Sequence, residues 1–126
     1  MILAIARTLL VAMFIFSGLV KFMDLTRTAA HIAGKGLPAP MLLAACAGAL
    51  EVTGGVLVMI GYRTREAALA LALFSIATAI LFHDFWNQAG REQVAQMLNA
   101  WENVSVAGGL VFVAFAGPGP VAVEKG

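Results

Sequence analysis

Four long apolar runs account for most of this chain, and they constrain its fold more than any other feature. The runs cover residues 2–22, 41–62, 67–86 and, with the turn that begins at Trp101, 101–117. A helix needs about 20 predominantly apolar residues to cross the hydrocarbon core of a bilayer, which is about 30 Å thick. The sequence therefore predicts an all-α fold, an integral membrane four-helix bundle that forms a single domain over residues 1–126.

Composition supports this membrane environment. Hydrophobic residues make up 61% of the chain and charged residues 12%, whereas soluble domains contain about 45–50% apolar and 25% charged residues. Within residues 41–60, only Glu51 and Thr53 are polar. Helices of a small soluble bundle carry a polar face toward water, so this composition argues against a soluble helical domain.

We expect the first apolar run to be a retained transmembrane helix and not a cleaved signal peptide. The apolar part of a signal peptide spans about 7–15 residues and is followed by a small-residue cleavage site. The run 2–22 is longer than that, and no such site precedes a polar region after it.

Charge and cysteine content exclude two further classes of protein. The net charge is +1, and no basic stripe of the kind that follows a phosphate backbone is present, so we expect no nucleic-acid partner. The single cysteine, Cys46, lies inside the second apolar run. It cannot form an intramolecular disulfide, a CxxC redox pair or a thiolate-rich metal site, and we interpret it as a small buried hydrophobic residue.

The connections between the runs differ in length. Gly61 can end the second helix, Thr64 can cap the third, and Glu66 is favourable in its first turn. This short loop makes the second and third helices antiparallel neighbours. The connections 21–40 and 84–103 therefore emerge together at the other membrane face.

Each long connection is predicted to contain an interfacial helical segment. Residues 26–33 read as a short helix bounded by Gly34 and Gly36. In 91–103, apolar residues recur at helical spacing, so the fourth helix is expected to begin outside the membrane and enter it without interruption.

Small residues recur inside the spans, at Ala44 and Gly48, at Gly54-Gly55 and at Gly108-Gly109. Such residues let membrane helices approach closely and also make a homo-oligomer reasonable. The Arg63-x-Arg65 turn favours a cytoplasmic location for the short loop, and with it for both termini.

Glu51 is the clearest ionisable residue within a span. Charged residues at a helix centre cost about 2.5–3.5 kcal/mol on insertion scales and usually face the bundle interior. Glu51 lies nine residues before Ile60, roughly 13 Å along a helix, and Arg7 lies near the same membrane face. We therefore predict an Arg7–Glu51 pair, which either fixes helix register or places a proton-accepting carboxyl beside a ligand pocket.

A second group of polar residues lies at the opposite membrane face. Lys21 ends the first helix, His83-Asp84 end the third, and Glu102-Asn103 begin the membrane part of the fourth. These residues either converge on one pocket mouth or belong to an ordinary interface, with Trp86 and Trp101 in an aromatic belt. No metal site is expected, because His83 and His31 stand without ligand spacing around them.

In these same regions the chain resembles the DoxX family of small four-helix membrane proteins. The likeness covers nearly the whole chain. It rests on Arg7 with Phe16-Ser17-Gly18-Leu19-Val20-Lys21-Phe22, on Gly48-Ala49-Leu50-Glu51-Val52-Thr53-Gly54-Gly55, on Phe82-His83-Asp84-Phe85-Trp86 and on Glu102-Asn103-Val104 with Gly108-Gly109-Leu110. At Glu102 the chain departs from the family, in which a lysine is expected.

The resemblance implies a bacterial-type inner-membrane protein that is a subunit of a redox complex, either quinone-linked or concerned with thiol and oxidative stress. It would be at most a non-autonomous subunit of an oxidoreductase. Its ligand would be a quinone, bound without a covalent link in a cavity that Glu51 and Arg7 line. Lys21 and His83 would lie at the mouth, where the histidine could relay a proton to a quinone carbonyl. A soluble oxidoreductase or a sulfurtransferase is the implied partner. The alternative is a non-catalytic membrane scaffold or a carrier of small solutes or cargo.

Overall fold

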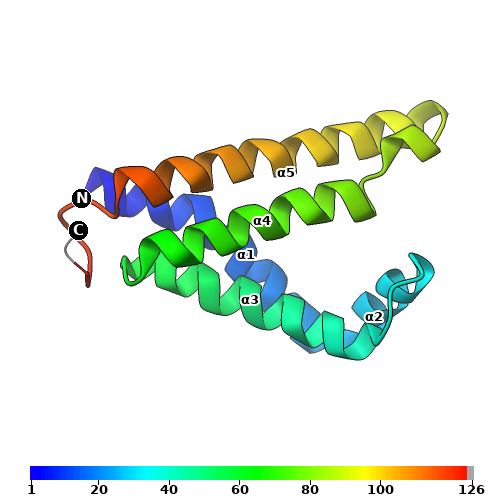
Figure 1. Ribbon diagram of the computed structural model, residues 1–126, viewed down its shortest axis with the longest axis horizontal. Coiled ribbons are helices and arrows are strands. Elements are labelled where there is room, and N and C mark those ends of the chain that lie inside the picture. Colours follow the sequence, from blue (N-terminus) through cyan, green and yellow to red (C-terminus); the bar gives the residue numbers. More distant parts are fainter. Residues whose placement is uncertain (125–126) are drawn as a thin grey trace.

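The computed structural model describes residues 1–124, and this part of the chain is helical without any strand (Figure 1). Four helices are long and apolar enough to cross a membrane. These findings confirm the all-α membrane bundle. In order, the elements are α1 (Ile2–Met23), α2 (Leu25–Gly34), α3 (Pro40–Ile60), α4 (Thr64–Phe82), the 3₁₀ turn η1 (Phe85–Asn87) and α5 (Gly90–Ala116).

The two long connections contain the expected helical segments. The segment predicted at 26–33 is α2, and its N-terminus is capped by the Asp24 side chain, which accepts a hydrogen bond from the backbone N–H of Arg27 (3.2 Å). The segment predicted at 91–103 is the first half of α5, which runs without a break into the membrane span. Helix α4 ends at Phe82, and with the 3₁₀ turn η1 the third candidate span reaches Asn87, beside the predicted end at residue 86.

The short loop departs from the prediction at its capping residue. Gly61 ends α3 in the left-handed conformation (φ 76°), and its N–H and that of Tyr62 bond back to the Leu57 carbonyl. Thr64, however, is already the first residue of α4, and its buried hydroxyl has no hydrogen-bond partner within residues 1–124. The prediction that Thr64 caps this helix was wrong.

Two helix pairs build the bundle: α1 packs along α3, and α4 packs along α5. Glycines allow the backbones of α1 and α3 to approach each other closely. A Cβ atom on Gly18 would lie 2.6 Å from Cγ2 of Val52, and one on Gly55 would lie 2.6 Å from Cγ1 of Ile15. The predicted close approach at Gly48 and Gly54-Gly55 is therefore present, whereas a Cβ on Gly108 would meet open space.

The pairs join most tightly at the end that carries the short loop and both termini, called the packed end below. Its core contains fully buried side chains from every span. They are Val11, Val58, Ala68, Leu71 and Leu110. Leu71 of α4 packs against Gly54 of α3, which links the two pairs.

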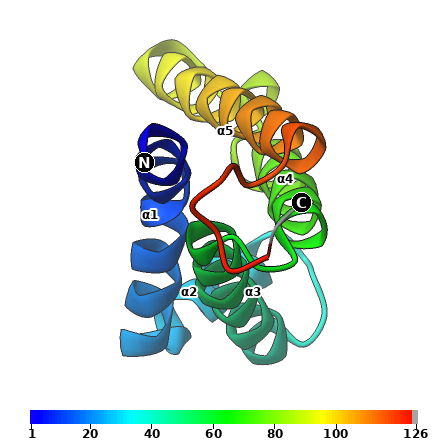
Figure 2. The ribbon, with the colours of Figure 1, turned by 90° about the vertical axis from the view of Figure 1, so that its left-hand side faces the viewer.

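The C-terminal segment 117–124 crosses this packed end, as Figure 2 shows from that side. It pairs with the end of α3, because the Val123 N–H donates to the Ile60 carbonyl (3.0 Å) and the Glu124 N–H to the Gly61 carbonyl (2.9 Å). The Glu124 carboxylate also accepts a hydrogen bond from the Arg63 N–H (2.5 Å). The segment therefore closes this end of the bundle.

The outer surface of the spans is apolar, as expected for contact with lipid. Large hydrophobic side chains are well exposed on α1, α4 and α5, including Leu9 (72%), Leu73 (73%) and Phe112 (73%). Cys46 is exposed too, so its prediction as a buried residue was wrong, because its face of α3 is turned away from the other helices.

At the other end the helix pairs diverge, and α2 folds across that end (Figure 1). Ala29 and Ile32 of α2 pack on Ala44 of α3 in a small second core, which Phe82 at the end of α4 also contacts. This end, called the open end below, contains the polar residues that the sequence places at the second membrane face.

Candidate functional site

A cavity of about 670 Å³ occupies the open end between the two helix pairs. Its apolar walls include Leu10, Met13 and Phe14 of α1, Phe74 of α4 and Val106 of α5. Its polar lining comes from all five helices and the turn after α4. These polar residues are Ser17, Lys21, Thr28, His31, Lys35, Glu51, Ser75, Thr78, His83, Asp84, Gln88, Gln96 and Asn103.

A buried ion pair between α1 and α3 lines the cavity. The Lys21 ammonium lies 2.5 Å from the Glu51 carboxylate, whose side chain is 4% exposed. The same ammonium donates a hydrogen bond to the Ser17 hydroxyl (2.9 Å), one turn earlier on α1. Because Gly18 has no side chain, α1 comes close enough for a Cβ there to lie 3.1 Å from Cβ of Glu51. The glycine therefore brings Lys21 within reach of the carboxylate.

The Arg7–Glu51 pair predicted from the sequence is not formed. Arg7 is buried at the packed end, where its guanidinium donates, within residues 1–124, to backbone carbonyls only. Its acceptors are Val58 (3.0 Å) and Met59 (3.2 Å) at the end of α3, and Pro118 and Val121 (2.8 Å) in the C-terminal segment. A cation is favourable at a helix C-terminus, where carbonyls lack partners within the helix.

The register of α1 against α3 explains this error. Gly18 contacts Glu51 and Ile15 contacts Gly55, so these antiparallel helices are offset along their axes. Arg7, farther toward the start of α1, then lies beside the last residues of α3, and Lys21 lies on the Glu51 side of the cavity.

Polar residues of α4 form the facing wall of the cavity. Ser75 is 1% exposed, and its hydroxyl has no hydrogen-bond partner within residues 1–124. Thr78, one turn later, donates to the Phe74 carbonyl (2.9 Å). The sequence analysis missed both residues. Their three-residue spacing within an apolar run was the available signal, because it places two hydroxyls on one helix face.

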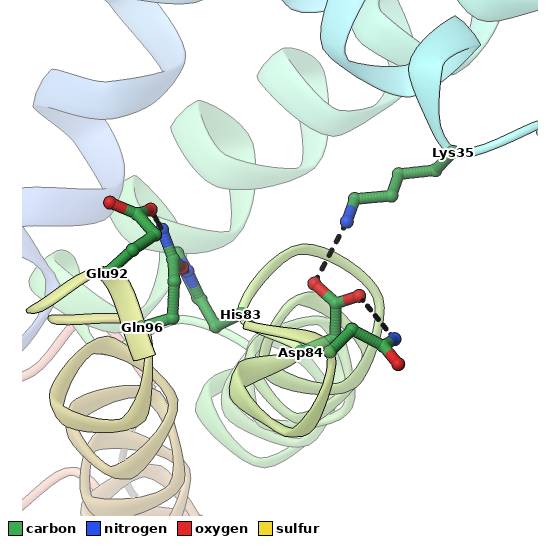
Figure 3. A network of polar contacts seen from close by, with 6 residues as sticks. Lys35, His83, Asp84, Glu92 and Gln96 are labelled. Carbon is green, nitrogen blue, oxygen red and sulfur yellow. Dashed lines mark hydrogen bonds and ion pairs between the residues drawn. The ribbon is translucent and has the colours of Figure 1, made fainter. Parts of the chain in front are cut away.

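Two groups of polar contacts lie near the cavity mouth (Figure 3). The Lys35 ammonium lies 2.9 Å from the Asp84 carboxylate, which also accepts a hydrogen bond from the Asn87 amide (2.9 Å). His83 contacts Gln96 through Nδ1 and Oε1 (2.8 Å). The first group connects the end of α2 with the turn after α4, and the second connects that turn with α5.

Five of the seven side chains singled out from the sequence line the same cavity, and two do not. Those that line it are Lys21, Glu51, His83, Asp84 and Asn103. Arg7 lies at the packed end, and Glu102 is exposed outside the cavity. Glu102 precedes Asn103 on α5, and neighbouring residues on a helix point in different directions.

The described residues offer no metal site of protein ligands. Within residues 1–124, no three side chains of the His, Cys, Asp or Glu type lie close enough together to hold an ion.

The aromatic residues Trp86 and Trp101 are more than half exposed near this end, as residues of an interfacial belt would be.

Comparison with known proteins identifies the family. The model of the DoxX family matches residues 2–84, about two thirds of the chain. The chain belongs to the DoxX family. The match includes α1 to α4 and thus the Lys21–Glu51 pair, Ser75 and His83.

Two relatives of this DoxX protein extend the likeness through α5. The inner membrane protein YphA of Escherichia coli strain K12 is 35% identical over 124 residues, which is 98% of this chain and 89% of YphA. The inner membrane protein YqjF of the same strain is 30% identical over 121 residues, 96% of this chain and 88% of YqjF. No solved structure matches the chain at a significant level.

With four membrane-spanning helices and these relatives, the chain is a multi-pass protein of the bacterial-type inner membrane. The cytoplasmic location of its termini stays a prediction from the Arg63 and Arg65 turn.

Proposed function

We propose that this DoxX protein binds a quinone-type ligand in its open-end cavity, as the membrane subunit of a redox complex. The observation that carries the proposal is the Lys21–Glu51 ion pair, which is buried within the membrane part of the protein and yet borders empty space. A pair that served only helix register would be expected to be packed on all sides.

The size and lining of the cavity support a small amphipathic ligand. A volume of about 670 Å³ lies within the range of about 300–1,000 Å³ that is usual for small-molecule sites. Such sites combine mostly apolar walls with a few polar groups that fix orientation. The apolar walls here include Phe14, Phe74 and Val106. The polar groups that could fix the orientation of a ligand include Lys21, Ser75 and His83.

The polar groups of the cavity suit the oxygens of a quinone. An ammonium has three N–H donors. On Lys21 one of them donates to Ser17, and the ammonium forms an ion pair with Glu51 at 2.5 Å. The remaining donor capacity of Lys21 and the Ser75 hydroxyl, which has no partner within residues 1–124, are available to ligand oxygens. Reduction of a quinone consumes protons and oxidation of the quinol releases them. Glu51 and His83 are groups that can donate a proton in the first case and accept one in the second.

Electron transfer would fall to a partner protein. The chain contains one cysteine and two histidines, too few for a thiolate cluster, and it has no flavin fingerprint. A soluble oxidoreductase or a sulfurtransferase at the membrane surface would supply electrons, while this chain binds the ligand and exchanges protons with it.

Equilibrium binding of a short-chain ubiquinone analogue to the detergent-solubilised protein tests the proposal. We expect saturable binding by the wild type and at least about tenfold weaker binding by Glu51→Gln, because Lys21 loses its charged partner. Glu102→Gln is the matched control, since this glutamate is exposed outside the cavity. It should bind as the wild type does.

The scaffold or carrier alternative predicts the opposite pattern. A well-folded wild type that binds no quinone, or a Glu51→Gln variant that binds as tightly as the wild type, would contradict the proposal. If Glu51→Gln lowered the melting temperature without any effect on quinone binding, the ion pair would serve only to fix the register of the helices.

A further inference from the structure

A chain of hydrogen bonds connects the cavity to the surface through α5. His83 Nδ1 lies 2.8 Å from Oε1 of Gln96, and Nε2 of Gln96 donates to Oε1 of Glu92 (3.0 Å). Glu92 and Gln96 are one turn apart on the part of α5 that precedes the membrane, and His83 ends α4 (Figure 3). His83 and Gln96 line the cavity, whereas Glu92 is exposed.

The chemistry of these groups fixes the direction of each hydrogen bond. An ionised carboxylate can only accept, so the Glu92 oxygen faces the NH₂ group of Gln96. The amide oxygen of Gln96 therefore faces His83, and it too can only accept. It follows that Nδ1 of His83 carries the hydrogen, and that Nε2 of the neutral ring has a free lone pair.

Nε2 is available to a ligand. The only hydrogen bond of the ring within residues 1–124 is the one through Nδ1, and the ring is partly exposed where it borders the cavity. An acceptor in this position favours a ligand that presents an O–H or N–H group and disfavours a ligand that presents only a carbonyl.

We propose that Gln96 and Glu92 are positioning residues that hold His83 as an acceptor, so that the cavity binds the hydroxyl of a hydroquinone. This inference rests on the proposed function and makes it more specific, because it names the reduced, hydroxyl-bearing form as the one that His83 recognises. Gln96 and Glu92 act only through the imidazole, and neither needs to touch the ligand.

The tautomer can be measured without any ligand. The protein has two histidines, His31 and His83. Labelling with ¹⁵N-histidine in lipid nanodiscs therefore gives the NMR signals of two imidazole rings, and a His31→Gln variant assigns them. We expect the neutral His83 ring to carry its proton on Nδ1. Gln96→Met should shift this proton toward Nε2, and Gln93→Met, on an exposed residue of the same helix, should not.

Ligand selectivity is measured with a matched pair of probes. A short-chain ubiquinol, kept reduced under argon, is compared with the same molecule in which both hydroxyls are methylated. We expect the wild type and Gln93→Met to bind the quinol about tenfold more tightly than the ether. In Gln96→Met this preference should fall to about twofold or less.

The outcomes separate this inference from the proposed function. Two results would overturn the inference and leave the proposed function standing, provided that quinone and quinol still bind. One is a proton on Nε2 of His83, and the other is quinol binding no tighter than binding of the ether. Failure of a folded wild type to bind any of the probes would overturn both the proposed function and the assignment of a hydroquinone.

Discussion

The two ends of this bundle bury charged residues in opposite ways. At the packed end, the Arg7 guanidinium donates to four backbone carbonyls, two of them in the C-terminal segment. At the open end, Lys21 and Glu51 pair beside a cavity of about 670 Å³. Four of the five N–H donors of Arg7 bond to backbone carbonyls, which indicates a structural role. The Lys21–Glu51 pair borders empty space, which indicates a binding role.

The packed end also has the denser apolar core of the two ends. Val11, Val58, Leu71 and Leu110 are fully buried in the core of the packed end. At the open end the helix pairs separate, and the buried core there is the small cluster of Ala29, Ile32 and Ala44. Most of the folding free energy is therefore expected to come from the packed end, which leaves the other end free to accommodate a ligand.

Removal of Arg7 should have the largest effect on stability. In Arg7→Ala, four carbonyls at the packed end lose their charged donor, and hydrogen bonds to charged groups contribute about 1.5–3 kcal/mol each, without full additivity. We expect a loss of at least about 3 kcal/mol in the free energy of unfolding, measured by denaturant titration in detergent. Arg91→Ala, on an exposed residue, is the control, and an equal effect of both would refute the comparison.

A methyl group at Gly18 should have the next largest effect. In Gly18→Ala, the new Cβ would lie 2.6 Å from Val52 and 2.8 Å from the Gly48 carbonyl, so α1 and α3 must separate. Overpacking of this kind costs about 1–3 kcal/mol, and we expect quinone binding to weaken because Lys21 moves away from Glu51. Gly108→Ala places its methyl group in open space and should change neither quantity.

The ion pair at the mouth should contribute least. Lys35 and Asp84 lie partly in solvent, with side chains 33% and 16% exposed, and such pairs contribute about 0–1 kcal/mol. Lys35→Ala should therefore lower the melting temperature by only a few degrees at most. A loss as large as that of Arg7→Ala would show that the open end is as important for folding as the packed end.

The sequence predicts most of the fold, because span length and loop length are local properties. Four apolar runs and one short loop determine which helices are antiparallel neighbours, and the helical spacing in 91–103 predicts the early start of α5. The cavity of the open end is lined by three of the residues that the sequence places at the second membrane face, namely Lys21, His83 and Asn103.

The partner of Glu51 could not be predicted, because it depends on how far α1 is shifted along α3. That offset is set by contacts between distant residues, such as Gly18 with Val52 and Ile15 with Gly55. The sequence provides two basic residues on the first span, Arg7 and Lys21, and the offset selects between them. The Gln96 contact with His83 likewise depends on the packing of α5 against α4.

Photoaffinity labelling with an azido-quinone, followed by peptide mapping, tests most directly whether the two ends differ in function. We expect labels at the open end, on the segments of α1 and α4 that contain Phe14 and Phe74. Unlabelled quinone should compete with this labelling, and Glu51→Gln should abolish it. Labels spread over lipid-facing residues such as Leu9 and Phe112, without competition, would show that the open end is not a quinone site.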